Sequence, residues 1–166
     1  TGLMTQIAQV TMSTETVTTS KNNYLHLNCE LATYSKWDHF FKIRDLYEAY
    51  VNPTSLKPNL YKRSIDEGGW TKKEKYIFKG TTVNSTVKKR NKPETTKTFT
   101  IGSSTQDVVS LVYKVRTLDY SKFKIGQSQT FKIVFDEKEI AVSLKYLGLE
   151  EIQAGKIGRE YLKKVR

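Results

Sequence analysis

Apolar side chains occupy every second position over much of the chain, which is the pattern of strands that bury one face. In residues 24–31, Leu25, Leu27, Cys29 and Leu31 alternate with polar side chains, so this segment predicts a half-buried strand. The same alternation predicts a hairpin whose strands lie near residues 131–135 and 140–146. Runs rich in Thr, Val and Tyr predict further strands over residues 5–18, 46–51, 60–65, 70–78, 83–89 and 95–101, and a last hairpin over 149–165 around Gly155.

Turn residues separate these runs and predict how the strands pair. Asp66-Glu67-Gly68-Gly69 lies between the runs 60–65 and 70–78. Arg90-Asn91-Lys92-Pro93 lies between the runs 83–89 and 95–101. Turns that contain Gly or Asn between β-rich segments are typical of hairpins, so consecutive strands are expected to pair antiparallel.

One segment, residues 105–117, has helical spacing. Val108, Leu111, Val112 and Val115 recur every three to four positions and predict an apolar stripe that packs on the sheet. Ser104 followed by Asp107 predicts a capped N-terminus, and Arg116 lies where a cation suits the helix dipole. A short helical turn is also expected within residues 35–43, with Ser35 as its N-cap.

These elements predict a mainly β fold: a curved antiparallel meander sheet or open barrel with one amphipathic helix packed on it. Because the strands alternate, each sheet buries one face only, and we expect the helix to cover the concave face. The 166 residues include 10 Tyr, 7 Phe and 2 Trp, which favours one folded domain over residues 1–166.

The chain is basic, with 28 Lys and Arg against 17 Asp and Glu and a formal net charge of +11. Such an excess attracts nucleic acid, anionic lipid headgroups or acidic polysaccharide. The cations are spread along the chain, which favours a solvated surface that blocks edge pairing, so nucleic acid is not an expected partner. No run of about 18 apolar residues occurs, so we expect no transmembrane segment.

The sequence shows no set of catalytic residues. Cys29 is the one cysteine, and on a strand the histidine three positions away, His26, points to the opposite face. Together with His39, these residues do not supply the ligand set of a zinc site. No phosphate loop or nucleophile elbow is present. We therefore expect no enzyme activity, no metal and no cofactor, although carboxylates that converge in space leave a hydrolase open.

The run Phe41–Pro58 contains an Arg-Asp pair, a strand, an Asn turn and a Leu-x-Pro. Together with residues 63–69, 76–78, 105–110, Tyr113 and the regions of Gly126 and Gly148, it resembles a family of exported bacterial proteins of the Bacteroides type, domain of unknown function 3108. The resemblance covers about residues 5–160. It implies an exported protein of the periplasm or cell envelope with a β-rich fold and no established activity.

The resemblance also singles out charged positions. Arg44, Asp45, Asp107 and Arg116 match charged positions of the family pattern. One interpretation is that they form structural ion pairs or cap element ends. The other is that they line the mouth of a ligand cavity beneath the helix. Lys79 departs from the pattern, which commonly has Asp there, and the pattern extends further at both ends, so we expect the chain to lack family elements there.

We expect the protein to bind a lipid or other amphiphile in the concave face of the sheet, because a lipocalin-like half-barrel with an aromatic interior suits an apolar tail. The alternative is a structural or protein-interaction module of the envelope that uses sheet edges or its basic surface.

Overall fold

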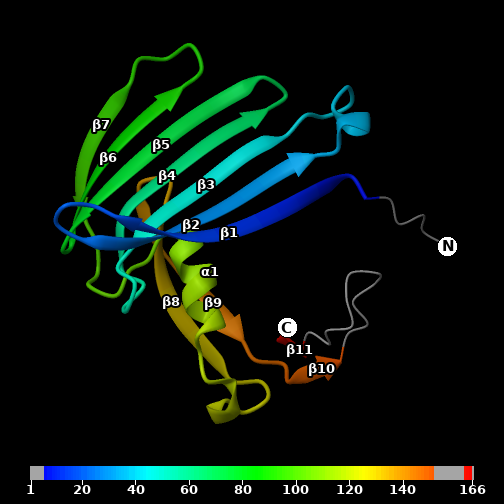
Figure 1. Ribbon diagram of the computed structural model, residues 1–166, viewed down its shortest axis with the longest axis vertical. Coiled ribbons are helices and arrows are strands. Elements are labelled where there is room, and N and C mark those ends of the chain that lie inside the picture. Colours follow the sequence, from blue (N-terminus) through cyan, green and yellow to red (C-terminus); the bar gives the residue numbers. More distant parts are fainter. Residues whose placement is uncertain (1–5, 152–162, 166) are drawn as a thin grey trace.

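The computed structural model describes residues 6–151 and 163–165. Seven strands pair in chain order as one antiparallel meander, which confirms the predicted fold class. They are β1 (Ala8–Thr18), β2 (Asn23–Thr33), β3 (Arg44–Val51), β4 (Pro58–Glu67), β5 (Trp70–Lys79), β6 (Thr82–Lys89) and β7 (Thr95–Thr100). The sheet is curved, with β1 and β7 at its edges, and the described strands do not close a barrel (Figure 1).

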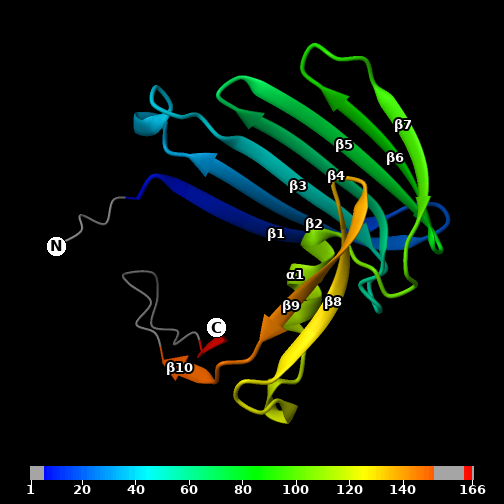
Figure 2. The same cartoon turned by 180° about the vertical axis from the view of Figure 1, so that it is seen from behind.

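The rest of the described chain lies on one side of this sheet. Helix α1 (Val108–Arg116) is followed by the hairpin of β8 (Ser128–Phe135) and β9 (Lys138–Lys145). Figure 2 shows α1 and this hairpin in front of the large sheet. Two 3₁₀ turns, η1 (Ser35–Trp37) and η2 (Tyr120–Lys122), complete the connections. Within the described residues, no helix has the length and apolar character needed to cross a membrane.

The last predicted hairpin is described in part. Strands β10 (Leu149–Glu151) and β11 (Lys163–Val165) pair antiparallel, as predicted. The turn expected around Gly155 lies outside the described residues.

The core lies between the large sheet and these elements. Leu27, Ala49, Tyr61 and Tyr76 are successive neighbours across β2 to β5, and all are at most 1% exposed. They form one cluster with Val109 of α1 and Val134 of β8. We call the face that carries this cluster the inner face and the opposite face the outer face. Alternation along each strand therefore assigns every side chain to one of the two.

The helix is shorter than predicted at its start, and Ser104 is not its cap. The N-cap is Asp107, whose carboxylate accepts from Ser110 N at 2.9 Å, while Ser110 Oγ accepts from Asp107 N at 3.1 Å. Gln106 N donates to Lys132 O at 3.0 Å, and Gln106 O accepts from Val134 N at 2.9 Å. Because this pairing with β8 holds Gln106 extended, the helix cannot begin before it.

Two other local predictions also need correction. Val112, expected in the buried stripe of α1, is 43% exposed, whereas Val109 is 2% exposed and packs in the core. Ser35 is the first residue of η1 and not its N-cap; Tyr34 holds that position and makes no side-chain cap bond. Instead, Thr33 Oγ1 donates to Asp38 Oδ1 at 2.6 Å, which fixes this loop from the end of β2.

Candidate functional site

Charged side chains are buried on the inner face where the turn of the β8–β9 hairpin meets the large sheet. Arg63 of β4 and Lys72 and Glu74 of β5 point inward and are at most 7% exposed. Lys72 Nζ lies 2.8 Å from Glu74 Oε1 and 2.7 Å from Asp136 Oδ1 of the turn. Arg63 Nη2 donates to the same Asp136 oxygen at 2.6 Å, and Arg63 Nε forms an ion pair with Glu74 Oε2 at 2.6 Å. Cations and carboxylates therefore alternate around a closed cluster.

The turn itself has an uncommon backbone. Asp136 and Glu137 have φ of 48° and 60°, in the left-handed region that disfavours residues with a Cβ. Glu137 N donates to Tyr76 OH at 3.0 Å, and the Glu137 carboxylate accepts from Ser85 Oγ. Contacts with the sheet therefore hold the turn in this conformation.

The charges of the cluster stabilise one another. Burial alone raises the pKa of Asp136, but Lys72 and Arg63 outweigh it and hold the pKa below its usual value. Burial by itself lowers the pKa of Arg63, but the charge of Glu74, the largest of the favourable interactions, raises it above its ordinary value. Pairing of this kind makes the cluster a clamp between sheet and hairpin.

The sequence of β5 contains a signal for this clamp. Lys72 and Glu74 occupy the same alternating positions of β5 as the buried Tyr76 and Phe78. A charged side chain at an inward position of an otherwise apolar strand face needs a buried partner.

The inner face is less covered beside α1 and the edge strand β1. Met12, Cys29 and Tyr47 are successive neighbours across β1, β2 and β3, and Val10 and Leu31 form the next row. Val10 is 60% and Met12 38% exposed, while Cys29, Leu31 and Tyr47 are half-buried. We call these five residues the open strip.

Helix α1 borders the open strip directly. Tyr113 OH donates to Ser13 O of β1 at 3.1 Å, which places the helix beside the edge strand. The strip is thus a run of apolar side chains in contact with water on the face that elsewhere forms the core, and exposed apolar patches mark binding surfaces.

The structure separates the two neighbouring charges that start β3. Asp45 continues the row of Val10 and Leu31 on the inner face, is 4% exposed, and accepts from Asp66 N at 3.2 Å. Its burial raises its pKa. Arg44 instead forms an ion pair with Asp38, with Nη2 2.5 Å from Oδ2, and this pair lowers the pKa of Asp38. Asp45 borders the open strip, and Arg44 braces the loop before β3.

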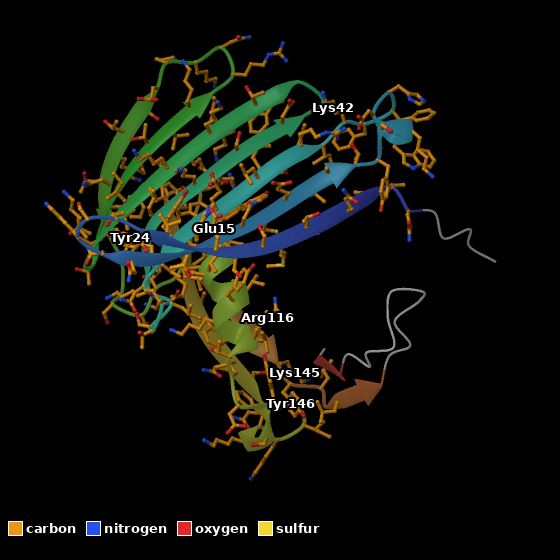
Figure 3. The ribbon with its side chains drawn as sticks, viewed as in Figure 1. Glu15, Tyr24, Lys42, Arg116, Lys145 and Tyr146 are labelled. Atoms are coloured by element: carbon orange, nitrogen blue, oxygen red, sulfur yellow. The ribbon has the colours of Figure 1, made fainter. Side chains whose placement is uncertain are left out.

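The other two predicted site residues lie at opposite ends of α1. Asp107 is the buried N-cap, and burial raises its pKa to about 6. Arg116 is exposed in the last turn, with Cζ 5.7 Å from the centre of the Tyr113 ring (Figure 3). A nine-residue helix separates its ends by about 13 Å, so these two side chains do not share one pocket.

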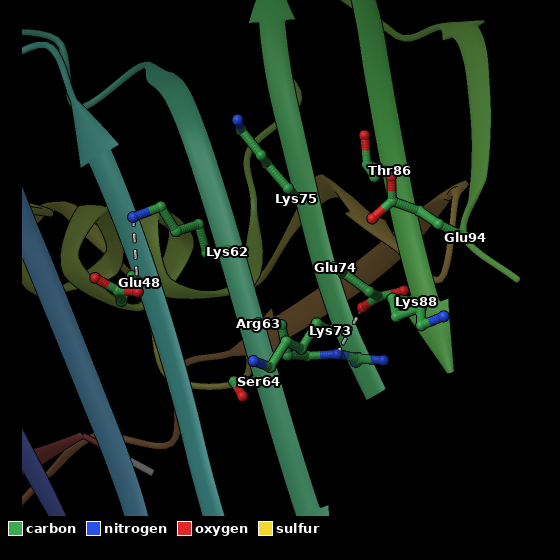
Figure 4. Close-up of a pocket in the computed structure, with 10 residues that line it drawn as sticks. All are labelled: Glu48, Lys62, Arg63, Ser64, Lys73, Glu74, Lys75, Thr86, Lys88 and Glu94. Carbon is green, nitrogen blue, oxygen red and sulfur yellow. Dashed lines mark ion pairs between the residues drawn. The ribbon is translucent and has the colours of Figure 1, made fainter. Parts of the chain in front are cut away.

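The outer face carries a hollow of about 380 Å³ (Figure 4). Its cations face each other directly, with Lys62 opposite Lys75 and Lys73 opposite Lys88. Lys62 Nζ lies 4.0 Å from Glu48 Oε2. In the part of the chain that the structure describes, Lys73, Lys75 and Lys88 form no ion pair. Like charges directly opposite one another destabilise a sheet, so an anion bound in this hollow would be stabilising.

The histidine and cysteine that could suggest catalysis lie on opposite faces, as their spacing predicts. His26 is on the outer face, with Nδ1 2.8 Å from Glu15 Oε1 and Nε2 3.0 Å from Glu48 Oε1. Cys29 is on the inner face, and partial burial raises its pKa. Among residues 6–151 and 163–165, no three His, Cys, Asp or Glu side chains are grouped to hold a metal ion.

Comparison with known proteins identifies the family. Neither the curated proteins nor the solved structures give a match. A family model described as "Protein of unknown function (DUF3108)" matches residues 2–164, nearly the whole chain, in agreement with the resemblance drawn from the sequence. The chain belongs to the DUF3108 family.

Proposed function

We propose that this protein is an exported, non-enzymatic protein of the periplasm or cell envelope that binds a lipid or other amphiphile on the inner face of its sheet. The open strip carries the proposal. Val10 and Met12 are 60% and 38% exposed on the inner face of the edge strand β1. Covering such side chains with an apolar ligand is favourable by about 25 cal/mol per Å² of buried apolar surface.

The geometry of the strip suits a segment of one extended acyl chain. Its two rows cross β1, β2 and β3, which are spaced about 4.8 Å apart, so the rows span about 10 Å. Asp45 borders the strip because it ends one row, and Arg116 lies in the last turn of α1, the helix that reaches β1 through Tyr113. In the proposal, Arg116 attracts an anionic headgroup. Arg44 and Asp107 contribute indirectly, because they fix the start of β3 and of α1.

The remaining parts of the proposal have separate support. The non-enzymatic role is consistent with the separation of His26 and Cys29 on opposite faces of the sheet. Among the residues that the structure describes, the pKa is raised for the carboxyl groups of Asp45 and Asp107. Asp45 accepts a hydrogen bond from Asp66 N, and Asp107 accepts one from Ser110 N. Export to the envelope follows from the resemblance of the sequence to exported proteins. A net charge of +11 favours ligands with an anionic headgroup.

A matched pair of variants tests the binding surface. Met12 on the inner face and Ile77 on the outer face are both 38% exposed. Native mass spectrometry of the protein purified from cells would detect a retained amphiphile, and titration with oleate would measure affinity after delipidation. Met12→Asn should weaken oleate binding about tenfold, and Ile77→Asn should leave it unchanged. Equal effects of the two variants, or no binding by the unmodified chain, would contradict the proposal.

The lysine pairs of the outer-face hollow favour a second candidate, an interaction module that binds an acidic partner in the envelope. Lys73 and Lys75 are both exposed and lie two positions apart on β5. In this candidate, binding of an acidic protein or polymer such as heparin weakens steeply with salt and is lost in Lys73→Gln/Lys75→Gln. Oleate binding by that variant would be unchanged, which separates the two candidates.

A further inference from the structure

Three connections lie together at one end of the large sheet. They are residues 34–43 between β2 and β3, 68–69 between β4 and β5, and 90–94 between β6 and β7. In an antiparallel meander every second connection falls at the same end. Hydrogen bonds also join them, since Gly68 N donates to Lys42 O at 2.8 Å and Arg90 Nη1 donates to Gly69 O at 2.5 Å. We call these connections, with the adjoining Lys89 and Trp70, the aromatic end.

The aromatic end exposes large apolar rings. Phe40 is 74%, Phe41 55% and Trp70 46% exposed. Trp37 packs on Phe40, with ring centres 5.8 Å apart. Trp37 and Trp70 are the two tryptophans of the chain, so both lie at the aromatic end. Trp and other amphipathic rings favour the level of lipid headgroups, where one part of the ring is apolar and another is wet.

Cations surround these rings. Lys36, Lys42, Lys89 and Lys92 are exposed at the aromatic end (Lys42 is labelled in Figure 3), and Lys36 Nζ lies 5.8 Å from the centre of the Trp37 ring. Two carboxylates also lie in these connections: Asp38, which forms an ion pair with Arg44, and the exposed Glu94, so the cations outnumber the acids. Surfaces that bind anionic membranes typically combine exposed aromatic side chains with cations.

The opposite end of the same sheet lacks this composition. Its connections are residues 19–22, 52–57 and 80–81, which contain the cations Lys21 and Lys57, with Lys79 adjoining, and no Phe or Trp. The aromatic rings are thus concentrated at one end, and a general excess of basic residues does not account for that asymmetry.

We propose that the aromatic end docks the protein on an anionic lipid bilayer. The rings of Phe40, Phe41 and Trp70 enter the headgroup region, and the surrounding lysines pair with lipid phosphates. At this end β2 finishes at Thr33 and β3 begins at Arg44. Leu31 and Asp45, which pair across these strands, lie within two residues of that end. Docking therefore brings one end of the open strip to the membrane. Docking does not depend on amphiphile binding, but a role in loading the strip from the membrane rests on the proposed function.

Tryptophan fluorescence reports docking without a label, because both tryptophans lie at the aromatic end. The full chain is mixed with vesicles of phosphatidylcholine alone, or with one-third phosphatidylglycerol, and binding is measured by co-sedimentation. We expect binding to the anionic vesicles, a blue shift of the emission, and quenching by brominated phosphatidylcholine. Absence of binding, or co-sedimentation with unshifted and unquenched emission, would overturn the proposal.

Matched variants locate the contact. Phe40→Ser/Phe41→Ser should weaken vesicle binding at least about tenfold, whereas Ile125→Ser, at a side chain 78% exposed elsewhere, should not. Lys89→Gln/Lys92→Gln should weaken it about 30-fold at low salt, and Lys21→Gln/Lys57→Gln at the opposite end much less. Equal losses in the control variants would overturn the assignment of the surface.

Oleate binding separates this proposal from the proposed function. Phe40→Ser/Phe41→Ser should keep the oleate affinity of the unmodified chain while losing vesicle binding, which would support docking through this end. If the unmodified chain binds vesicles with quenched tryptophans but binds no oleate, docking is supported and only the amphiphile proposal fails.

Discussion

Lys72 Nζ and Asp136 Oδ1 lie 2.7 Å apart and tie the turn of the β8–β9 hairpin to the first half of β5. Arg63 from the neighbouring strand reaches the same oxygen at 2.6 Å. This clamp fixes the hairpin over β4, β5 and β6. The hairpin covers that part of the inner face and does not reach β1, where Val10 and Met12 stay exposed.

Removing the buried carboxylate of the clamp should be costly. Glu74 is buried, at 4% exposed, and forms ion pairs with Arg63 and Lys72. In Glu74→Gln, Asp136 is the one carboxylate that still pairs with these two cations. Breaking a buried ion pair by removing one partner typically costs about 3–5 kcal/mol. The free energy of unfolding in urea should fall by about that amount, whereas exposed Glu94→Gln should change it by less than about 0.5 kcal/mol. A loss below about 1 kcal/mol for Glu74→Gln would show that the clamp is not needed for stability.

Asp107 should make stability fall as pH rises. Its folded-state pKa is raised to about 6 from an ordinary value of 3.8, so the unfolded chain releases this proton first. Between about pH 4 and 6 a rising pH therefore favours unfolding through this group. Asp107→Asn keeps an N-cap oxygen but does not titrate.

Urea unfolding across that range checks this sign. The wild-type chain should lose stability relative to Asp107→Asn as pH rises from about 4 to 7, while Asp107→Ala, which removes the cap, should be less stable than Asp107→Asn by about 1 kcal/mol throughout. A gap between wild type and Asp107→Asn that stays constant with pH would contradict the assignment.

Glu139 should have the opposite pH dependence. Its carboxylate accepts from the Thr105 hydroxyl and from Gly102 N at 2.6 Å, and these bonds lower its pKa to about 2 from 4.5. The stabilisation is present above about pH 4.5 and is lost as pH falls toward 2. Glu139→Gln does not titrate, so the stability advantage of the wild type should shrink on acidification. Parallel unfolding curves for the two proteins from pH 5 to about 2 would disprove this role.

The strands and their order follow from local signals, and long-range contacts decide the rest. Leu27 and Cys29 share the inner face because alternation is a property of the strand itself. The start of α1 is different, because two residues are possible N-caps. Ser104 precedes Asp107 by three positions, and Asp107 precedes Ser110 by three positions, so spacing alone does not decide whether Ser104 or Asp107 caps the helix. The pairing of Gln106 with β8 makes the choice, and it depends on how the chain folds back.

The same distinction applies to the candidate sites. The inward direction of Cys29 and Leu31 is predictable, but their partial exposure depends on how far α1 and the hairpin extend over the sheet. The clamp joins Arg63 to Asp136, which are 73 positions apart. Of the charges singled out by family resemblance, Asp45 borders the open strip and Arg116 is exposed in the last turn of α1, whereas Arg44 and Asp107 make local ion-pair and capping contacts.

The reactivity of the Cys29 thiol tests most directly whether the open strip holds an amphiphile. Cys29 is the one cysteine of the chain, it is half-buried, and it lies between Met12 and Tyr47 in the strip. Its rate of reaction with a thiol reagent is measured on the folded, delipidated protein with and without saturating oleate, and on the urea-unfolded chain as a control. An acyl chain lying on the strip should slow the reaction at least about tenfold in the folded protein only. An unchanged rate while oleate is bound would place the ligand elsewhere and contradict the account.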